Sequence, residues 1–277
     1  MANFELRYQR VYPTDMTDEQ WYIIRRWLPS SPPIGADRSV DMRRIVEGIF
    51  FVSRSGCQWR LLPKTYENWN TTYGYFNRWR KDGTWERIHG ALRCDVRQQE
   101  GHDPTPSAAI LDSQSVKTTE TPGPRGYDAG KKVKGRKRHL LVDTLGLILA
   151  VVVHPANIQD RDGAKLVFEK VRGKLRRLSL VWADGGYAGQ LIQWLADFCH
   201  WTLQIVKRCD KATGFHVLPR RWVVERTFGW IGRCRRLSKD YEADPRSSEA
   251  MVYIAMIHLM LRRLTRPAAG HHLEYVS

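Results

Sequence analysis

Two short apolar segments that each end in an aspartate constrain the fold most. Residues 108–111 (AAIL) precede Asp112, and residues 178–183 (LSLVWA) precede Asp184, which two glycines follow. Each apolar run is too short for a helix but long enough for a buried strand. A carboxylate at the end of a buried strand costs free energy unless a cation meets it, so each aspartate indicates a functional site. The alternative is an aspartate that simply opens a turn after a strand.

A third segment can complete such a site. Residues 219–230 begin with a proline, and their apolar side chains recur at helical spacing, which predicts a helix. Glu225 lies on this helix beside the apolar stripe, one turn after Arg221. Asp112, Asp184 and Glu225 can converge on a pair of divalent ions. Hard oxygen ligands of this kind suit Mg²⁺ or Mn²⁺ and not zinc.

Other carboxylates compete for these roles. Glu242 follows Asp184 in the sequence but lies in a polar loop, which cannot hold a ligand rigidly. Glu249 lies in the first turn of the last predicted helix, where the helix dipole already explains a negative charge. Asp160 and Asp162 open another helix, and a role at the helix N-terminus explains them. Glu225 is placed in mid-helix by the same pattern and is the preferred third ligand.

The charge of the chain points to a polyanionic partner. The 277 residues include 45 Lys and Arg against 29 Asp and Glu, a net charge of +16. Such an excess favours nucleic acid first and an anionic membrane second. No run of about 18 apolar residues and no signal-peptide layout is present, which argues against a membrane protein. Five scattered cysteines without a Cys-x-x-Cys pair indicate reduced thiols, a cytoplasmic location and no zinc ribbon.

The first 100 residues predict an all-helical module. Helices are expected at about 17–28, 41–53, 68–80 and 84–97, and they include a candidate helix-turn-helix. The third helix would read DNA through exposed polar side chains. These are Thr71, Thr72, Tyr75, Asn77, Arg78 and Arg80. The alternative is a helical domain used for packing or dimerisation.

A basic segment follows the first aspartate. Residues 118–138 are rich in Gly and Pro, and then become strongly basic. A solvated loop is the usual structure of such a run. Beside a metal site, a clamp for DNA phosphates is the preferred interpretation. Its members are Lys131, Lys132, Lys134, Arg136, Lys137 and Arg138.

The remaining elements predict a mixed sheet covered by helices. Strands at 139–143 and 148–154 form a hairpin, and a helix at 160–171, a strand to Asp184, a helix at 189–199 and a strand at 202–207 follow. A last apolar helix at 249–264 packs on the sheet. The fold class is therefore mixed α+β, with a helical domain at 1–100, a second domain at 101–266 and a tail at 267–277.

Four strings, in this order along the chain, resemble the DDE transposases of the insertion-sequence-5 family. They are residues 110–116 (ILDSQSV), 135–143 (GRKRHLLVD), 183–187 (ADGGY) and 222–230 (WVVERTFGW). The resemblance extends from about residue 17 to about residue 264. It implies a ribonuclease H-like catalytic domain preceded by the helical DNA-binding domain.

The resemblance also implies an activity. Asp112, Asp184 and Glu225 would be the catalytic residues and would bind two Mg²⁺ or Mn²⁺ ions per active site, with Asp112 bridging both. The enzyme would bind the terminal inverted repeats of an insertion sequence, cleave at its ends and join the 3′-hydroxyls to target DNA. Its partners would be double-stranded DNA, as element ends and as target, and a second copy of the chain. No membrane partner is expected.

Further side chains around the glutamate are candidates for DNA contacts. Arg220, Arg221 and Arg226 would hold phosphates, and Trp222 and Trp230 could stack on an unpaired base. The alternative for both tryptophans is core packing. His139 and His154 are interpreted as ordinary strand residues rather than as metal neighbours.

Three hypotheses follow for the function. The first is an active transposase. The second is a non-catalytic DNA-binding regulator derived from one, which the presence of all three carboxylates disfavours. The third is a metal-dependent nuclease that cuts DNA but does not join it.

Overall fold

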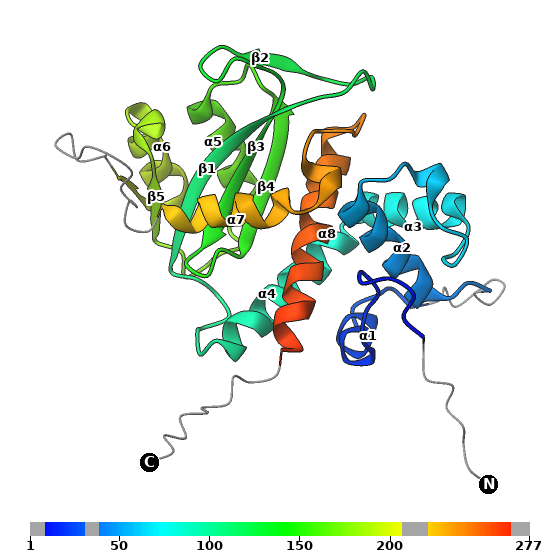
Figure 1. The fold of residues 1–277 in the computed structure, drawn as a ribbon. Coiled ribbons are helices and arrows are strands. Elements are labelled where there is room, and N and C mark those ends of the chain that lie inside the picture. Colours follow the sequence, from blue (N-terminus) through cyan, green and yellow to red (C-terminus); the bar gives the residue numbers. More distant parts are fainter. Residues whose placement is uncertain (1–8, 31–38, 207–220, 267–277) are drawn as a thin grey trace, which may run out of the picture.

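The computed structural model describes residues 9–30, 39–206 and 221–266. A twisted sheet with its covering helices forms one side of the molecule, and the N-terminal helices form the other (Figure 1). The long C-terminal helix stands between them. The mixed α/β class predicted from the sequence is confirmed.

The N-terminal helices begin and end where local sequence signals predict. Thr17 caps the first helix, and its side chain and that of Gln20 satisfy each other's backbone N–H groups. Asp41 caps the second helix, and Gly56 ends it in the left-handed conformation (φ +73°). The helices are α1 (Asp18–Arg25), α2 (Met42–Ser55), α3 (Trp69–Lys81) and α4 (Thr84–Gln99), with a 3₁₀ turn η1 (Trp59–Leu61).

The sheet has a mixed topology. Its strands are β1 (Ala108–Lys117), β2 (Gly126–Asp128), β3 (Val133–Asp143), β4 (Ile148–Pro155), β5 (Leu180–Ala183) and β6 (Thr202–Ile205). The order is β2-β3-β1-β5-β6, and β4 also pairs with β3. β3 is antiparallel to β1 and β4, whereas β5 is parallel to β1 and β6. β3 begins at Val133 and not at 139 as expected, so four of the six basic residues named above lie in a strand.

Helices cover both faces of the sheet. α5 (Asp160–Val171) and α6 (Gln190–Cys199) cover one face; α7 (Trp222–Gly232) and α8 (Pro245–Leu264) cover the other (Figure 1). Alternation along β1 divides its side chains between the two faces: Ala109 and Leu111 belong to the core under α5 and α6, and Ile110 to the core under α7. Short 3₁₀ turns follow β5 (η2, Gly185–Tyr187) and α7 (η3, Arg235–Leu237).

α8 joins the sheet to the N-terminal helices. Eleven of its side chains are buried, on every side of the helix. It packs against β4 and α7 on one flank and against α1, α2, α3 and α4 on the other. One hydrophobic core therefore continues from α2 to the sheet. The division into domains at residue 100 stays a prediction.

α8 also begins earlier than predicted. It starts at Pro245, capped by Asp244, and not near 249. In the described part of the chain, no helix is long and apolar enough to span a membrane.

Candidate active site

Strand register places Asp112 and Asp184 side by side. β1 continues to Lys117, so Asp112 lies within the strand and not at its end as expected. β5, however, pairs only with residues 108–110 of β1, and it ends at Ala183. Asp112 therefore lies in the part of β1 that extends beyond its pairing with β5, and Asp184 directly follows the carboxyl end of β5.

α7 brings Glu225 to the same edge. Val223, Val224 and Thr227 are buried against the sheet, whereas the Glu225 side chain is 55% exposed. The helix begins at Trp222 with Arg221 as its N-cap residue, so Glu225 lies in the first turn and not in mid-helix as predicted. The expected start at Pro219 lies outside the described residues. A carboxylate in the first turn is favoured by the helix dipole.

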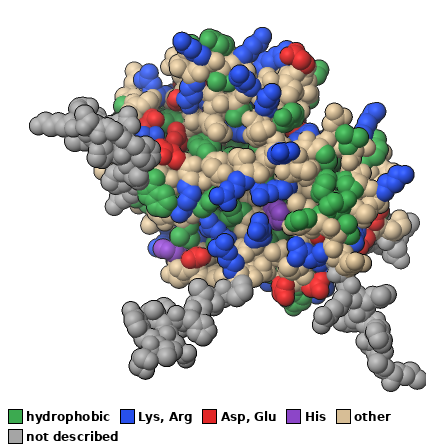
Figure 2. Space-filling model, in the orientation of Figure 1, with side chains coloured by type: hydrophobic (Ala, Val, Ile, Leu, Met, Phe, Trp, Pro, Cys, Tyr) green, Lys and Arg blue, Asp and Glu red, His purple; other side chains and the backbone are tan. Residues whose placement is uncertain are grey.

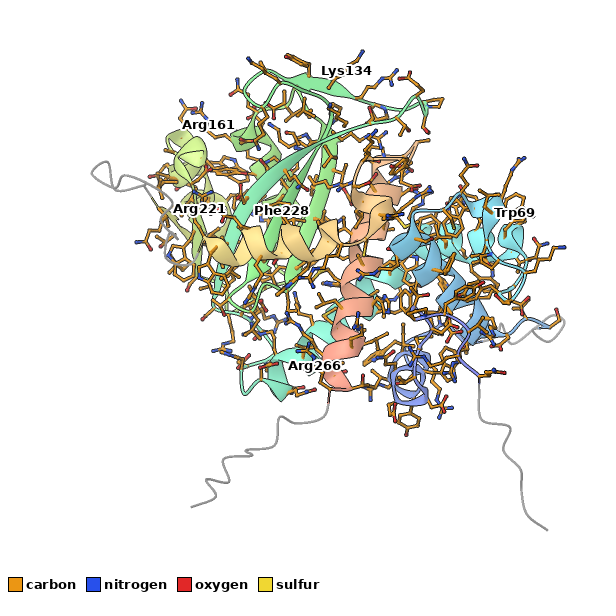
Figure 3. All side chains as sticks on the ribbon, viewed as in Figure 1. Trp69, Lys134, Arg161, Arg221, Phe228 and Arg266 are labelled. Carbon is orange, nitrogen blue, oxygen red and sulfur yellow. The ribbon has the colours of Figure 1, made fainter. Side chains whose placement is uncertain are left out.

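Arg221 lies among the three carboxylates. Its Nη2 atom is 3.6 Å from Asp112 Oδ2, 3.6 Å from Asp184 Oδ2 and 3.8 Å from Glu225 Oε1. Figure 3 shows Arg221 at the start of α7 beside the sheet, with Phe228 further along the helix. Three acidic side chains far apart in the sequence thus surround one guanidinium.

Burial makes this site electrostatically unusual. Burial raises the pKa of Asp112 to about 6, and the nearby Asp184 charge adds to the rise. The backbone N–H of Ser113, at 2.7 Å from Asp112 Oδ1, and the Arg221 charge oppose it. Burial also raises the pKa of Tyr187 well above its ordinary value, with the Asp112 charge contributing. A cation beside Asp112 therefore stabilises the charged form of this carboxylate.

The donor set fits a hard divalent ion in its chemistry but not in its spacing. All three groups are carboxylates, which Mg²⁺ and Mn²⁺ prefer. Their oxygens lie 3.6–3.8 Å from the central nitrogen, whereas Mg²⁺ binds oxygen at about 2.0–2.1 Å. Within the described residues, no set of three His, Cys, Asp or Glu is spaced closely enough for an ion. The carboxylates would have to draw together, and Arg221 would have to leave the centre.

The rival glutamates are engaged elsewhere. Glu242 Oε1 accepts a hydrogen bond from Arg236 at 2.7 Å. Glu249 accepts hydrogen bonds from the Val153 N–H at 3.0 Å and from Lys170 Nζ at 2.8 Å. Both side chains therefore stabilise the fold, which leaves Glu225 as the third carboxylate at this edge.

Asp160 forms a second charged group behind the site. Its Oδ1 atom accepts hydrogen bonds from Lys137 Nζ at 2.8 Å and from Ser113 Oγ at 3.1 Å. His139 Nε2 lies 3.8 Å from the same oxygen. Ser113 adjoins Asp112 but points to the opposite face of β1. Asp160, Lys137 and Ser113 therefore hold β1 from the face that α5 covers. The sequence interpretation of Asp160 as a helix-start residue missed it, although strand alternation at Ser113 and Lys137 could have signalled it.

His139 and His154 form a buried pair. Their Nδ1 and Nε2 atoms are 2.9 Å apart. Burial lowers the pKa of His139 to about 3, and the neighbouring His154 adds to the effect. Both rings pack in the core under α5, as ordinary strand residues.

Comparisons with known protein families identify the family of this chain. Residues 103–260, more than half of the chain, match the family described as "Transposase DDE domain". The chain belongs to the DDE transposases. Residues 16–89 match a second family, "Putative transposase of IS4/5 family", which places the chain in that group. The DDE domain of these enzymes is ribonuclease H-like, as the sequence resemblance implied.

One curated relative is an insertion-element protein. The "Insertion element IS402 uncharacterized 16.2 kDa protein" of Burkholderia cepacia is 30% identical over 122 residues. That match covers 42% of the transposase and 76% of the relative.

The basic segment of the transposase divides into two sets. Arg136 is buried and donates to the Glu242 and Ala243 carbonyls and to Asp240. Arg138 is buried and donates to two carbonyls near η3, and Lys137 pairs with Asp160. The expected phosphate clamp is therefore wrong for Arg136, Lys137 and Arg138, because internal acceptors already satisfy them. The exposed members are Lys131, Lys132 and Lys134.

The expected surface of α3 also needs correction. Thr72 is completely buried. Arg80 pairs with Asp244 at 2.6 Å and donates to Asn77. Thr71 and Tyr75 are half-buried. Arg78 is exposed and its guanidinium stacks over the Tyr75 ring at 5.3 Å. Contacts with DNA by Thr71, Tyr75 and Arg78 stay predictions.

Arg226 is clamped between two tryptophans on α7. Its guanidinium lies 4.5 Å from the centre of the Trp222 ring and 4.6 Å from that of Trp230. Its Nη2 donates to the Leu145 carbonyl at 3.0 Å. Trp222 is 42% exposed beside the carboxylates. Arg220 lies outside the described residues.

Proposed function

We propose that this transposase binds the terminal inverted repeats of an insertion sequence, cleaves DNA at the element ends and joins the 3′-hydroxyls to target DNA. The convergence of Asp112, Asp184 and Glu225 on one point carries the proposal. Two-metal phosphoryl transfer needs anionic side chains that hold the ions at the reacting phosphate, and it needs no side-chain nucleophile. This edge of the sheet offers such ligands on rigid elements.

Asp112, Asp184 and Glu225 would hold two Mg²⁺ or Mn²⁺ ions. When bound, these ions supply activation of the attacking oxygen and stabilisation of the leaving oxygen. Asp112, the most buried of the three carboxylates, is the candidate ligand to both. The strand and the helix fix these side chains, so little conformational freedom is lost on binding.

Arg221 has two roles in this proposal. In the free protein its charge offsets the repulsion among the three carboxylates. Once it leaves the centre, its planar guanidinium can donate two hydrogen bonds to a DNA phosphate. Trp222 is exposed next to it and can stack on an unpaired base at the cut end.

The partners follow from the chemistry. The excess of basic residues favours DNA, both as element end and as target. Joining two ends of one element requires that two active sites come together, so a homodimer in the DNA complex is part of the proposal.

One assay tests the proposal. Purified protein is incubated with labelled element ends and a target plasmid, in Mg²⁺ or in EDTA. Metal-dependent cleavage followed by joining supports the transposase. Cleavage without joining would indicate a nuclease, and binding without cleavage would indicate a regulator.

Three variants test the site itself. Asp112→Asn, Asp184→Asn and Glu225→Gln should abolish cleavage and leave binding of element ends nearly intact. Asp162→Asn, an exposed acid on α5, is the matched control and should cleave normally. Glu242→Gln and Glu249→Gln should also cleave if they fold. Retained cleavage by the Glu225 variant would move the third ligand elsewhere.

A further inference from the structure

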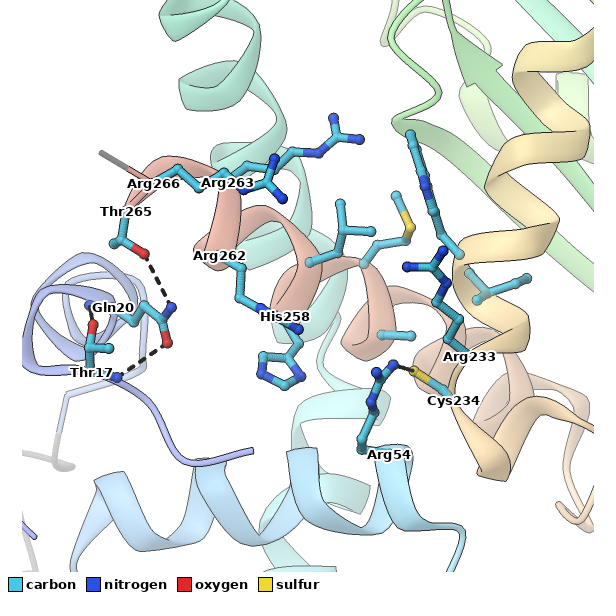
Figure 4. Close-up of a pocket in the computed structure, with 15 residues that line it drawn as sticks. Thr17, Gln20, Arg54, Arg233, Cys234, His258, Arg262, Arg263, Thr265 and Arg266 are labelled. Atoms are coloured by element: carbon cyan, nitrogen blue, oxygen red, sulfur yellow. Dashed lines mark hydrogen bonds between the residues drawn. The ribbon is translucent and has the colours of Figure 1, made fainter. Parts of the chain in front are cut away.

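A second basic site lies at the far end of α7. A cavity of about 540 Å³ opens between α1, the end of α2, the end of α7 and α8 (Figure 4). Five arginines from three of these segments line it, together with His258, Cys234 and Trp230. They are Arg54, Arg233, Arg262, Arg263 and Arg266. We call this site the arginine cavity.

Among the residues that the structure describes, no acidic side chain lines the arginine cavity. Within the described part of the chain, none of its five arginines forms an ion pair. Arg54 Nη1 has a contact with Cys234 Sγ at 4.0 Å, and the Arg263 guanidinium stacks over the Trp230 ring at 4.4 Å. Elsewhere this protein pairs its buried arginines: Arg97 with Asp143 at 2.6 Å is one example.

This concentration of like charge is unfavourable without an anion. Guanidinium groups that share one cavity repel each other, and the partly buried Arg54 and Arg263 are shielded less by water than exposed ones. His258 adds no charge: it stacks on Phe50 at 4.7 Å, and burial lowers its pKa to about 4. The cavity thus gathers cationic side chains that form no ion pair within the described part of the chain. Guanidinium groups suit phosphate because they donate in pairs.

The arginine cavity and the carboxylates lie on one face of the molecule. Figure 2 shows acidic side chains near the start of α7 and a gathering of Lys and Arg over α8. From Glu225 to Arg233 there are eight residues of helix, about 12 Å along the axis. That length matches roughly three to four base pairs of duplex DNA. Arg226 lies on α7 between the two sites.

We propose that the arginine cavity binds backbone phosphates of the duplex that flanks the cut site, three to four base pairs from the scissile phosphate. This inference rests on the proposed function, because it takes the carboxylates as the point of cutting. The common face and the spacing along α7 support duplex DNA over a free anion. The N-terminal helices and α8 would then grip the DNA together.

The test is DNA binding by the full chain in EDTA, which separates it from any failure of cleavage. A fluorescent duplex of the element end is titrated at several salt concentrations. The triple variant Arg54→Gln/Arg233→Gln/Arg262→Gln should bind more weakly, by roughly eightfold at 0.1 M salt for each phosphate that it no longer neutralises. The log–log salt slope should fall by about 0.9 for each such phosphate.

Matched variants control for charge and folding. Arg176→Gln, an exposed arginine outside the cavity, removes one charge, as the single Arg262→Gln variant does, and should leave the slope unchanged. Arg262→Lys should restore part of the affinity that Arg262→Gln removes. Thermal unfolding identifies any variant that fails to fold, and the single Arg262→Gln variant at the exposed rim then replaces the triple variant.

Footprinting locates the protected phosphates. Hydroxyl-radical protection of the backbone three to four base pairs from the cut should be present in wild type and absent in the triple variant. An unchanged slope or footprint would overturn the proposal. Inorganic tripolyphosphate that raises the Tm of wild type but not of the variant, with unchanged duplex binding, would show a small-anion site and would overturn it too.

Discussion

At the scale of single residues, Arg221 is the cation at the centre of the candidate active site. Its guanidinium occupies the point on which three carboxylates converge. A bound cation must therefore compete with a side chain of the protein itself. Such competition would keep the free enzyme weak in metal binding, and DNA phosphates could relieve it by drawing Arg221 away.

A variant of Arg221 tests this competition. We expect Arg221→Gln to raise the affinity of the DNA-free protein for Mn²⁺ by about an order of magnitude, because a positive charge within 4 Å of all three ligands is removed. Electron paramagnetic resonance of free Mn²⁺ measures the change. Arg226→Gln, which removes an equal charge one turn later, is the control. Unchanged or weaker Mn²⁺ binding in Arg221→Gln would contradict the idea.

Arg136 shows why a basic side chain need not contact DNA. It lies in the buried pair with Asp240 at 3.2 Å, and Ser248 also donates to that aspartate. We expect Arg136→Gln to lower the free energy of unfolding by about 3–5 kcal/mol, because Asp240 is left buried and unpaired. Lys134→Gln, at an exposed position, should change it by less than about 0.5 kcal/mol. Urea denaturation measures both. Equal stabilities would refute the structural role of Arg136.

The sequence predicts some of these residues and not others, for a physical reason. The sequence predicts that Asp112 and Asp184 lie close together because each follows a short apolar run. The length and composition of such a run can be read from the local sequence. Apart from the Pro124 carbonyl, the partners of Arg136 and Arg138 are more than 95 residues downstream, around η3 and the start of α8. No local pattern links such segments. A run of six basic residues therefore looked uniform, although half of it faces inward.

At the scale of elements, close approach of α5 to the sheet depends on a glycine. A Cβ atom on Gly163 would lie 2.4 Å from His139 Cε1 and 2.5 Å from His154 Nε2. The buried histidine pair thus fits under α5 because that position has no side chain. The apolar pattern predicted α5 itself, but the tight contact with two polar rings follows from the packing of separate strands.

We expect Gly163→Ala to destabilise the protein by about 1–3 kcal/mol, because the helix must shift away from both rings. Gly74→Ala in α3 is the matched control. Its added methyl group meets nothing within 4 Å, so the better helix propensity of Ala should stabilise by about 0.5–1 kcal/mol. Thermal unfolding of the two variants, compared with wild type, measures opposite shifts in Tm. Shifts of the same sign would contradict the packing argument.

The boundaries of elements were less predictable than their existence. β3 starts six residues earlier than expected, because β2 pairs with its first three residues. The basic side chains that this extension buries form hydrogen bonds or ion pairs inside the protein. α7 starts at Trp222, which changes the position of Glu225 from mid-helix to the first turn. The apolar periodicity within each element predicted its type but not its first residue.

At the scale of the whole molecule, buried histidines link stability to pH. The His89 ring on α4 packs against the Tyr253 ring of α8 at 4.9 Å, tilted by 56°, and burial lowers the pKa of His89 to about 3. The unfolded chain, with an ordinary pKa near 6.5, then binds more protons than the folded chain. Stability from this residue is therefore complete above about pH 6.5 and is lost as the pH falls toward 3.

We expect the folded protein to lose about 2 kcal/mol per such histidine between pH 7 and pH 5. His89→Phe keeps an aromatic ring between α4 and α8. It should reduce the loss of unfolding free energy between pH 7 and pH 5 by about 2 kcal/mol, the contribution of one histidine. Urea denaturation of both proteins at pH 7 and pH 5 measures the difference. An identical pH dependence in wild type and variant would show that His89 is not the titrating group.

The position of α8 in the chain has a consequence during synthesis. The N-terminal helices are made first, yet the helix that completes their core begins 146 residues after α4 ends. At roughly 5–20 residues per second, a ribosome needs about 7–30 s to cover that interval. Until then the helices keep an apolar surface uncovered. A chain that stops early, through a frameshift or a premature stop codon, therefore leaves the ribosome without the arginine cavity and with its helical core open, and is a ready substrate for proteases.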